Sequence, residues 1–86
     1  MLVVSRKQDE AVVLCNEDPA TKQLTLLAVI MVVECRGMGR VRIGMHYNTD
    51  IKIFRVELTE FDTMPIKKLC ALPIGTPVKM KKQAVA

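Results

Sequence analysis

Hydrophobic residues come in short runs separated by polar and turn-forming residues, a pattern typical of β-strands. The first run is LVVSRK, residues 2–7, which is rich in β-branched side chains and ends in two cations. QDE at 8–10 suits a turn, and AVVL at 11–14 forms a second apolar run. CNEDPATKQ at 15–23 combines asparagine, aspartate, proline and threonine, which indicates a turn or an exposed loop. The N-terminal segment is therefore predicted to hold two short strands joined by a turn.

The longest apolar run is LTLLAVIMVVEC, residues 24–35. It alternates little, as expected of a strand that is covered on both faces. A buried helix is the alternative, because periodicity alone does not separate the two. The many valines and isoleucines of this run favour a strand. RGMGR at 36–40 then places two glycines between apolar runs and predicts a hairpin.

Two further segments alternate between apolar and polar residues, VRIGM at 41–45 and IKIFRVEL at 51–58, with HYNTD between them. Neither face of the second segment is purely apolar, so one face is expected to meet something other than a core. One face carries Ile51, Ile53, Arg55 and Glu57, and the other carries Lys52, Phe54, Val56 and Leu58.

The pattern changes after residue 58. TEFDTMPIKKLCAL is expected to hold a short helix with Asp62 or Thr63 as its N-cap and Pro65 in its first turn. PIGTPVKMKKQAVA carries two prolines and three lysines and is expected to be a mobile basic tail.

These segments together predict a mostly β fold with five short strands and a short C-terminal helix or irregular tail. The strands would form a β domain at residues 1–60, with a long loop at about 15–24, followed by the helix and tail at 61–86. A chain of 86 residues is expected to be one folding unit.

Length and composition add three expectations. A chain this short buries only roughly 60% of its unfolded surface, so a single copy is marginally stable and association would help it. The net charge of +4 makes an anionic partner plausible. Cys15, Cys35 and Cys70 are odd in number and widely spaced, with no CxxC pair, so we expect small buried or half-buried side chains in a reducing compartment.

Motifs for catalysis, metals and membranes are missing from the sequence. The first apolar run holds four residues with cations after it, the reverse of a signal peptide, and the longest holds about ten of the roughly 20 that span a bilayer. His46 has no partner at metal-ligand or triad spacing. We therefore expect a cytoplasmic protein that is not an enzyme, with no cofactor, no metal, no membrane and no small-molecule substrate.

Three segments in order, MLVVSRK, VVECRG-x-GRVRIGM and IKIFRVEL, resemble the carbon storage regulator family of bacterial RNA-binding translational regulators. The resemblance covers residues 1 to about 58, and its specificity lies in the combination and order of the segments. It implies an interlocked homodimer in which the first strand of one subunit lies beside the last strand of the other. It also implies binding to GGA elements in hairpin loops of mRNA leaders, with an antagonist small RNA as a further partner.

The resemblance also assigns residues. Arg55 matches the family's most important arginine, whose planar five-donor fork grips a phosphate or a guanine edge. A composite site would combine the first strand of one subunit with the last strand of the other. The residues that the resemblance assigns to RNA binding are Val4, Arg6, Lys7, Arg40, Arg42, Ile51, Ile53, Phe54, Arg55 and Glu57.

Five departures indicate a divergent member of that family, one of them a C-terminal tail unlike the family's acidic amphipathic helix. Asp9 stands where the family has glycine, and Phe54 replaces a histidine. Tyr47, Asn48 and Thr49 stand in place of an Ala-Pro-Lys run, and the loop at 15–24 is longer. The replaced loop and Phe54 motivate an alternative function, a dimeric protein-interaction module that has lost RNA binding. In a third interpretation the cations are ordinary solvated surface charges, and no feature favours an enzyme.

Overall fold

The computed structural model describes residues 1–37 and 39–81 and is mostly β. The predictions of a strand at 2–7, a turn at 8–10 and a strand at 41–45 are confirmed to within one residue. The apolar run from residue 24 forms a strand, so the helical alternative is excluded. The elements are β1 (Leu2–Lys7), β2 (Ala11–Glu17), β3 (Leu24–Met31), β4 (Arg40–Met45), β5 (Ile51–Arg55), the 3-10 turn η1 (Val56–Leu58), helix α1 (Ile66–Leu69) and β6 (Pro77–Val78).

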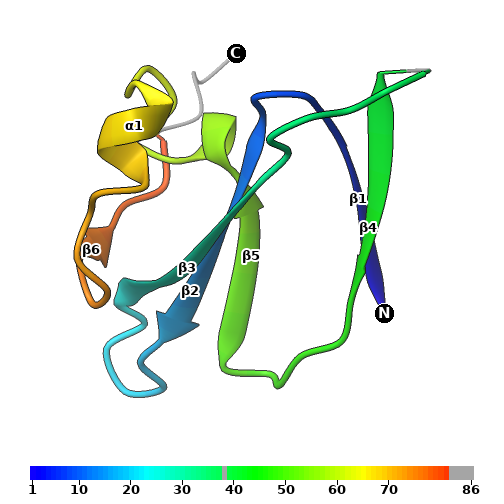
Figure 1. Ribbon diagram of the computed structural model, residues 1–86. Helices are drawn as coiled ribbons and strands as arrows, with labels where there is room; N and C mark the ends of the chain where they lie inside the picture. Colours follow the sequence, from blue (N-terminus) through cyan, green and yellow to red (C-terminus); the bar gives the residue numbers. More distant parts are fainter. Residues whose placement is uncertain (38, 82–86) are drawn as a thin grey trace, which may run out of the picture.

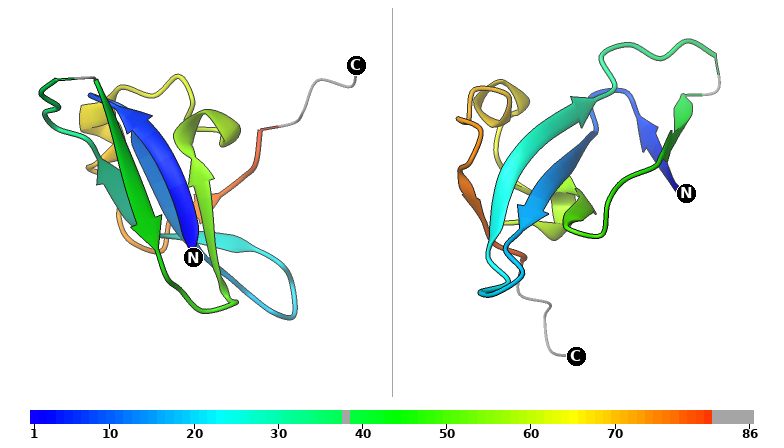
Figure 2. Two further views of the ribbon diagram at one scale, coloured as in Figure 1. Left: turned by 90° about the vertical axis from the view of Figure 1, so that its right-hand side faces the viewer. Right: turned by 90° about the horizontal axis from the view of Figure 1, so that it is seen from below.

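The strands form two antiparallel sheets, one with the order β5-β2-β3-β6 and one that contains β1 and β4. In Figure 1, β1 and β4 lie side by side on one side of the larger sheet, and α1 lies on the other side. The view from the right in Figure 2 places β1 and β4 in front of β2 and β3. The two-stranded sheet therefore covers one face of the larger sheet, and the C-terminal segment covers the other.

The core lies between the larger sheet and the C-terminal segment. Alternate residues of β2 point into it, because successive side chains of a strand face opposite sides. Cys15 is fully buried there, and burial raises the pKa of its thiol to about 11, so the group is a neutral thiol that packs as a small hydrophobe. The buried members of the core are Ala11, Val13, Cys15, Leu26, Phe61, Leu69 and Val78.

The hairpin predicted at residues 36–40 is wrong. β3 pairs with β2 and β6, and β4 pairs with β1. The chain after β3 turns toward the turn at 8–10 instead, where the Val32 amide donates to the Glu10 carbonyl and the Asp9 amide donates to the Val32 carbonyl. Gly37 and Gly39 do adopt positive φ, 87° and 79°, but in a connection between two sheets.

The strand predicted at 51–58 ends at Arg55, and η1 follows it. Thr59 explains this early end. Its side chain is fully buried, its hydroxyl donates to the Val56 carbonyl at 2.7 Å, and its own amide bonds to the same carbonyl. These two bonds close a turn, although the sequence there still alternates between apolar and polar residues. Glu57 therefore does not lie on the strand face that it was predicted to share with Arg55.

The C-terminal segment contributes a sixth strand that the sequence did not predict. In β6, Val78 is buried and pairs with Leu24 of β3. Helix α1 begins at Ile66, directly after Pro65, and its start has no side-chain cap, so the predicted cap at 62 or 63 is wrong. The part of the expected tail at 82–86 lies outside the described residues. In the described part of the chain, no helix is long and apolar enough to cross a membrane.

The loop predicted at about 15–24 is shorter in the structure, because β2 continues to Glu17 and β3 begins at Leu24. The remaining turn is organised by Asp18, whose carboxylate accepts hydrogen bonds from the Ala20 and Thr21 amides at 2.8 and 3.2 Å. Lys22 then adopts a φ of 62°, in the left-handed region that favours glycine. Asp9, in the turn before β2, has a φ of 67°.

Candidate nucleic-acid interface

Three predicted RNA-binding cations gather on the outer face of the β1–β4 sheet. In the antiparallel register Lys7 lies opposite Arg40, and Ser5 lies opposite Arg42. The strand alternation turns Lys7, Arg40 and Arg42 outward, and all three are exposed. We call these three residues the basic face.

The basic face has no internal compensation for its charge. Within residues 1–37 and 39–81, none of Lys7, Arg40 and Arg42 forms an ion pair with a carboxylate. Like charges directly opposite each other across two strands destabilise a sheet. A polyanion bound to this face would therefore relieve repulsion as well as add attraction.

Arg6 lies on the opposite side of the same strand and is only 4% exposed. Its guanidinium donates two hydrogen bonds to the Glu57 carboxylate, at 2.8 and 3.0 Å, and one to the Ala11 carbonyl at 3.1 Å. The bonds from Arg6 hold the pKa of Glu57 below its ordinary value. The structure thus places Arg6 and Glu57 together, with most of the Arg6 donors engaged inside the chain.

Arg55 lies at the end of β5, opposite Val12 of β2, and is exposed. Its positive charge also helps to lower the pKa of Glu57. The resemblance implied that these residues meet across two subunits. In the structure the Arg6–Glu57 contact is made within one chain.

The apolar predicted residues are covered to different extents. Val4 is 7% exposed, on the inner side of β1, whereas Ile51, Ile53 and Phe54 of β5 are half-buried. In the described part of the chain, β5 pairs only with β2 and β1 pairs only with β4. Each of these two strands therefore keeps one edge whose backbone groups have no neighbouring strand.

A hollow of about 310 Å³ lies where the β4–β5 loop meets β5. Three predicted residues, Ile51, Ile53 and Phe54, line it. The other lining residues were not predicted to belong to the site, although an aromatic residue in a polar loop was a usable signal. These residues are Tyr47, Asn48, Thr49 and Lys52.

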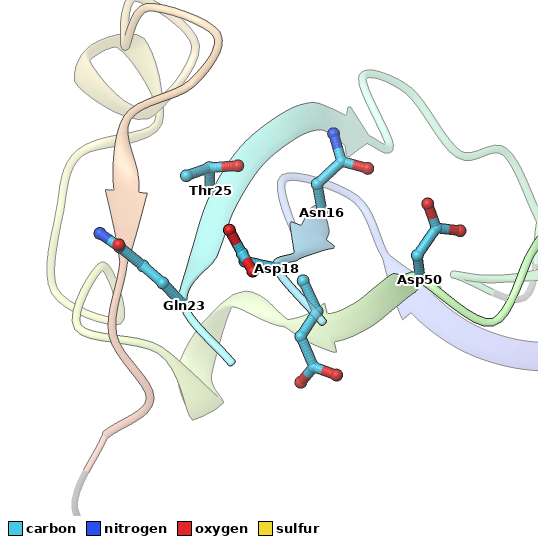
Figure 3. A pocket seen from close by; sticks show the side chains of 6 residues that line it. Asn16, Asp18, Gln23, Thr25 and Asp50 are labelled. Carbon is cyan, nitrogen blue, oxygen red and sulfur yellow. The ribbon is translucent and has the colours of Figure 1, made fainter. Parts of the chain in front are cut away.

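A second hollow, of about 270 Å³, lies at the β2–β3 turn and is shown in Figure 3. Its lining carries three carboxylates, from Glu17, Asp18 and Asp50, and no cation. The Asp18 carboxylate is already engaged with backbone amides of the turn. This negative lining repels phosphates, so the second hollow is a poor candidate for contact with nucleic acid.

The described residues contain no group of three or more histidines, cysteines, aspartates or glutamates that could hold a metal ion. The fold and the site together define the class of the protein: it is a small, mostly β protein with exposed cations on its strands. Searches of family models, curated proteins and solved structures found no match to the chain.

Proposed function

We propose that this protein is an RNA-binding post-transcriptional regulator of the carbon storage regulator type. It binds GGA-containing hairpin loops in mRNA leaders and controls translation or mRNA stability. The observation that carries the proposal is the basic face, where Lys7 and Arg40 lie directly opposite each other without a carboxylate partner in the described chain. A protein bound to the leader of an mRNA would keep ribosomes from loading on it.

Single-stranded RNA fits this surface better than a duplex. A-form helices hide their base edges, so readers of RNA sequence target loops with unstacked bases. The open edges of β1 and β5 offer backbone donors and acceptors to such bases. Arg55 supplies an exposed guanidinium at the end of β5. Its planar fork matches a phosphate or a guanine edge.

The functional unit is a homodimer. Open strand edges favour pairing with a second chain. Because Arg6 and Glu57 are already paired within one chain, each composite site then combines the exposed Lys7 of one chain with Ile53 and Arg55 of the other.

Two such sites on one dimer would bind two elements of one transcript. The second contact is then intramolecular, and its effective concentration raises the overall affinity without new contacts.

The test is a gel-shift titration of a hairpin with GGA in its loop against a GGA-to-CCA control, at two salt concentrations. We expect tighter binding to the GGA hairpin, and an affinity that falls by about 0.7 log unit per contacted phosphate for each log unit of salt. Arg55→Ala should weaken binding by on the order of 1–3 kcal/mol per site.

The matched control is Arg36→Ala. Arg36 is also an exposed arginine, but it lies in the connection after β3 and is paired with Glu34 at 3.1 Å. It should change the affinity little. Equal weak binding to both hairpins would reduce the interaction to charge attraction, and no binding to either would favour the protein-interaction module.

A further inference from the structure

The hollow beside β5 lies against a tight turn of the chain. The loop that leaves β4 turns back sharply, because the Ile51 amide donates to the Asn48 carbonyl at 3.0 Å. This turn sets Tyr47, Asn48 and Thr49 along one side of a space of about 310 Å³, and β5 forms the other side. A volume of this size is at the lower end of the range for small-molecule sites and admits one flat ring.

The lining combines the three kinds of group that an unstacked nucleotide requires. Tyr47 offers an aromatic face and is 42% exposed. Lys52 offers a charge, and its nearest carboxylate in the described chain, that of Glu17, lies 4.0 Å away, at the limit of an ion pair. Asn48 offers an amide that both donates and accepts. Aromatic stacking, a cation for the phosphate and a polar group for the base edge are the usual means of binding single-stranded RNA.

Two observations bear on the role of Tyr47. In the part of the chain that the structure describes, its hydroxyl forms no hydrogen bond. The loop also follows β4 directly, and β4 carries two of the three cations of the basic face. That strand spans about 17 Å, so an RNA strand bound along it from Arg40 leads to the hollow.

We propose that the hollow binds one unstacked base of single-stranded RNA, stacked on the ring of Tyr47, with Lys52 on the adjacent phosphate and Asn48 at the base edge. The proposal rests on the proposed function and deepens it. The base lies next to the RNA segment that the basic face holds, so this loop extends the recognised RNA sequence by one nucleotide. The three acids of the other hollow exclude the same role there.

Tyr47 is the only tyrosine of the chain, and there is no tryptophan. Tyrosine fluorescence therefore reports on this site alone. We expect titration with the GGA hairpin to quench the emission, after correction for absorbance with free tyrosine amide, with a midpoint equal to that of the gel shift. Unchanged emission at saturation would overturn the proposal.

Variants test the role of the ring. Tyr47→Leu removes the aromatic face and should weaken RNA binding by roughly 5- to 150-fold, the range for one base–aromatic stack. Tyr47→Phe keeps the ring and should bind like the parent. Ile74→Ala, which alters an exposed apolar residue (68%) away from the hollow, is the control. Unfolding by urea would show that Tyr47→Leu remains folded.

The outcomes separate this proposal from the function on which it rests. If the parent binds the GGA hairpin and Tyr47→Leu binds it equally, the stacking proposal is wrong and the RNA-binding function stands. If the parent binds neither hairpin, both are wrong. Weaker binding by Tyr47→Phe equal to that of Tyr47→Leu would show that the hydroxyl matters and the ring does not.

Discussion

Arg6 and Arg42 lie on the same two-stranded sheet in opposite environments. Arg6 is buried and holds the Glu57 carboxylate with two hydrogen bonds, whereas Arg42 is exposed on the basic face. A buried arginine that loses its partner becomes an uncompensated charge. Replacing Arg6 is therefore expected to lower mainly the stability of the fold, whereas replacing Arg42 is expected to lower mainly the affinity for RNA.

Glu57→Gln should lower the free energy of unfolding by about 1–2 kcal/mol at pH 7, because Arg6 loses a charge-assisted pair of hydrogen bonds. Half of the Glu57 side chain is exposed, which limits the effect. Urea unfolding followed by circular dichroism measures the change. The control is Glu34→Gln, which breaks an exposed Arg–Glu pair and should change stability by less than about 0.5 kcal/mol.

The same pair gives stability a dependence on pH. The pKa of Glu57 is lower in the folded chain than its unfolded value of about 4.3. Its contribution is therefore complete above that value and is lost as the pH falls through the folded pKa. The stability gap between the parent and Glu57→Gln should shrink below pH ~4. A gap that stays constant down to pH 3 would contradict the pair's role.

Among the described residues, two that are not glycine have positive φ, and both belong to the turns that flank β2. Lys22 ends the Asp18 turn at a φ of 62°, and Asp9 holds the turn after β1 at 67°. Side chains with a Cβ are strained in this region, although aspartate tolerates it better than most residues. Asp9, where the resemblance placed a glycine, thus lies at a position whose backbone favours glycine.

Lys22→Gly should raise the free energy of unfolding by about 1 kcal/mol, because it removes the left-handed strain without removing a buried contact. Asp9→Gly should give a smaller gain. Ala20→Gly lies in the same turn without a positive φ and should destabilise by about 0.5–1 kcal/mol through the unfolded chain. Denaturant midpoints for the three variants decide the matter, and a loss of stability in Lys22→Gly would refute the strain argument.

Several strand edges of the single chain have no neighbouring strand within residues 1–37 and 39–81. In the described chain, β1, β4 and β5 each keep an open edge (Figure 1). Open edges of this kind favour pairing with a second chain.

A dimer at micromolar concentration is therefore expected by sedimentation velocity. Its thermal midpoint should rise with protein concentration, because association stabilises the folded state by mass action. A monomer with a midpoint independent of concentration would remove the composite site. The basic face, which lies within one chain, would remain.

The sequence by itself determined most of the strands. Alternation and β-branched content predicted β1, β3 and β4, because each strand has its own local pattern. It also supplied the cations of the basic face, although it did not show that Lys7 and Arg40 lie opposite each other. The register between strands that are distant in sequence was needed for that.

Only the tertiary structure decided which strands and which side chains pair with each other. The glycines at 37 and 39 indicated a local hairpin, but β4 pairs with β1, and β6 takes part of the edge of β3, because burying long-range neighbours outweighs a local turn signal. In the sequence, Arg6 is simply one of two adjacent cations. Only the fold brings Glu57, 51 residues away, into contact with it and makes Arg6 part of a buried pair. The hollow at Tyr47 likewise exists only where a loop and a strand edge meet.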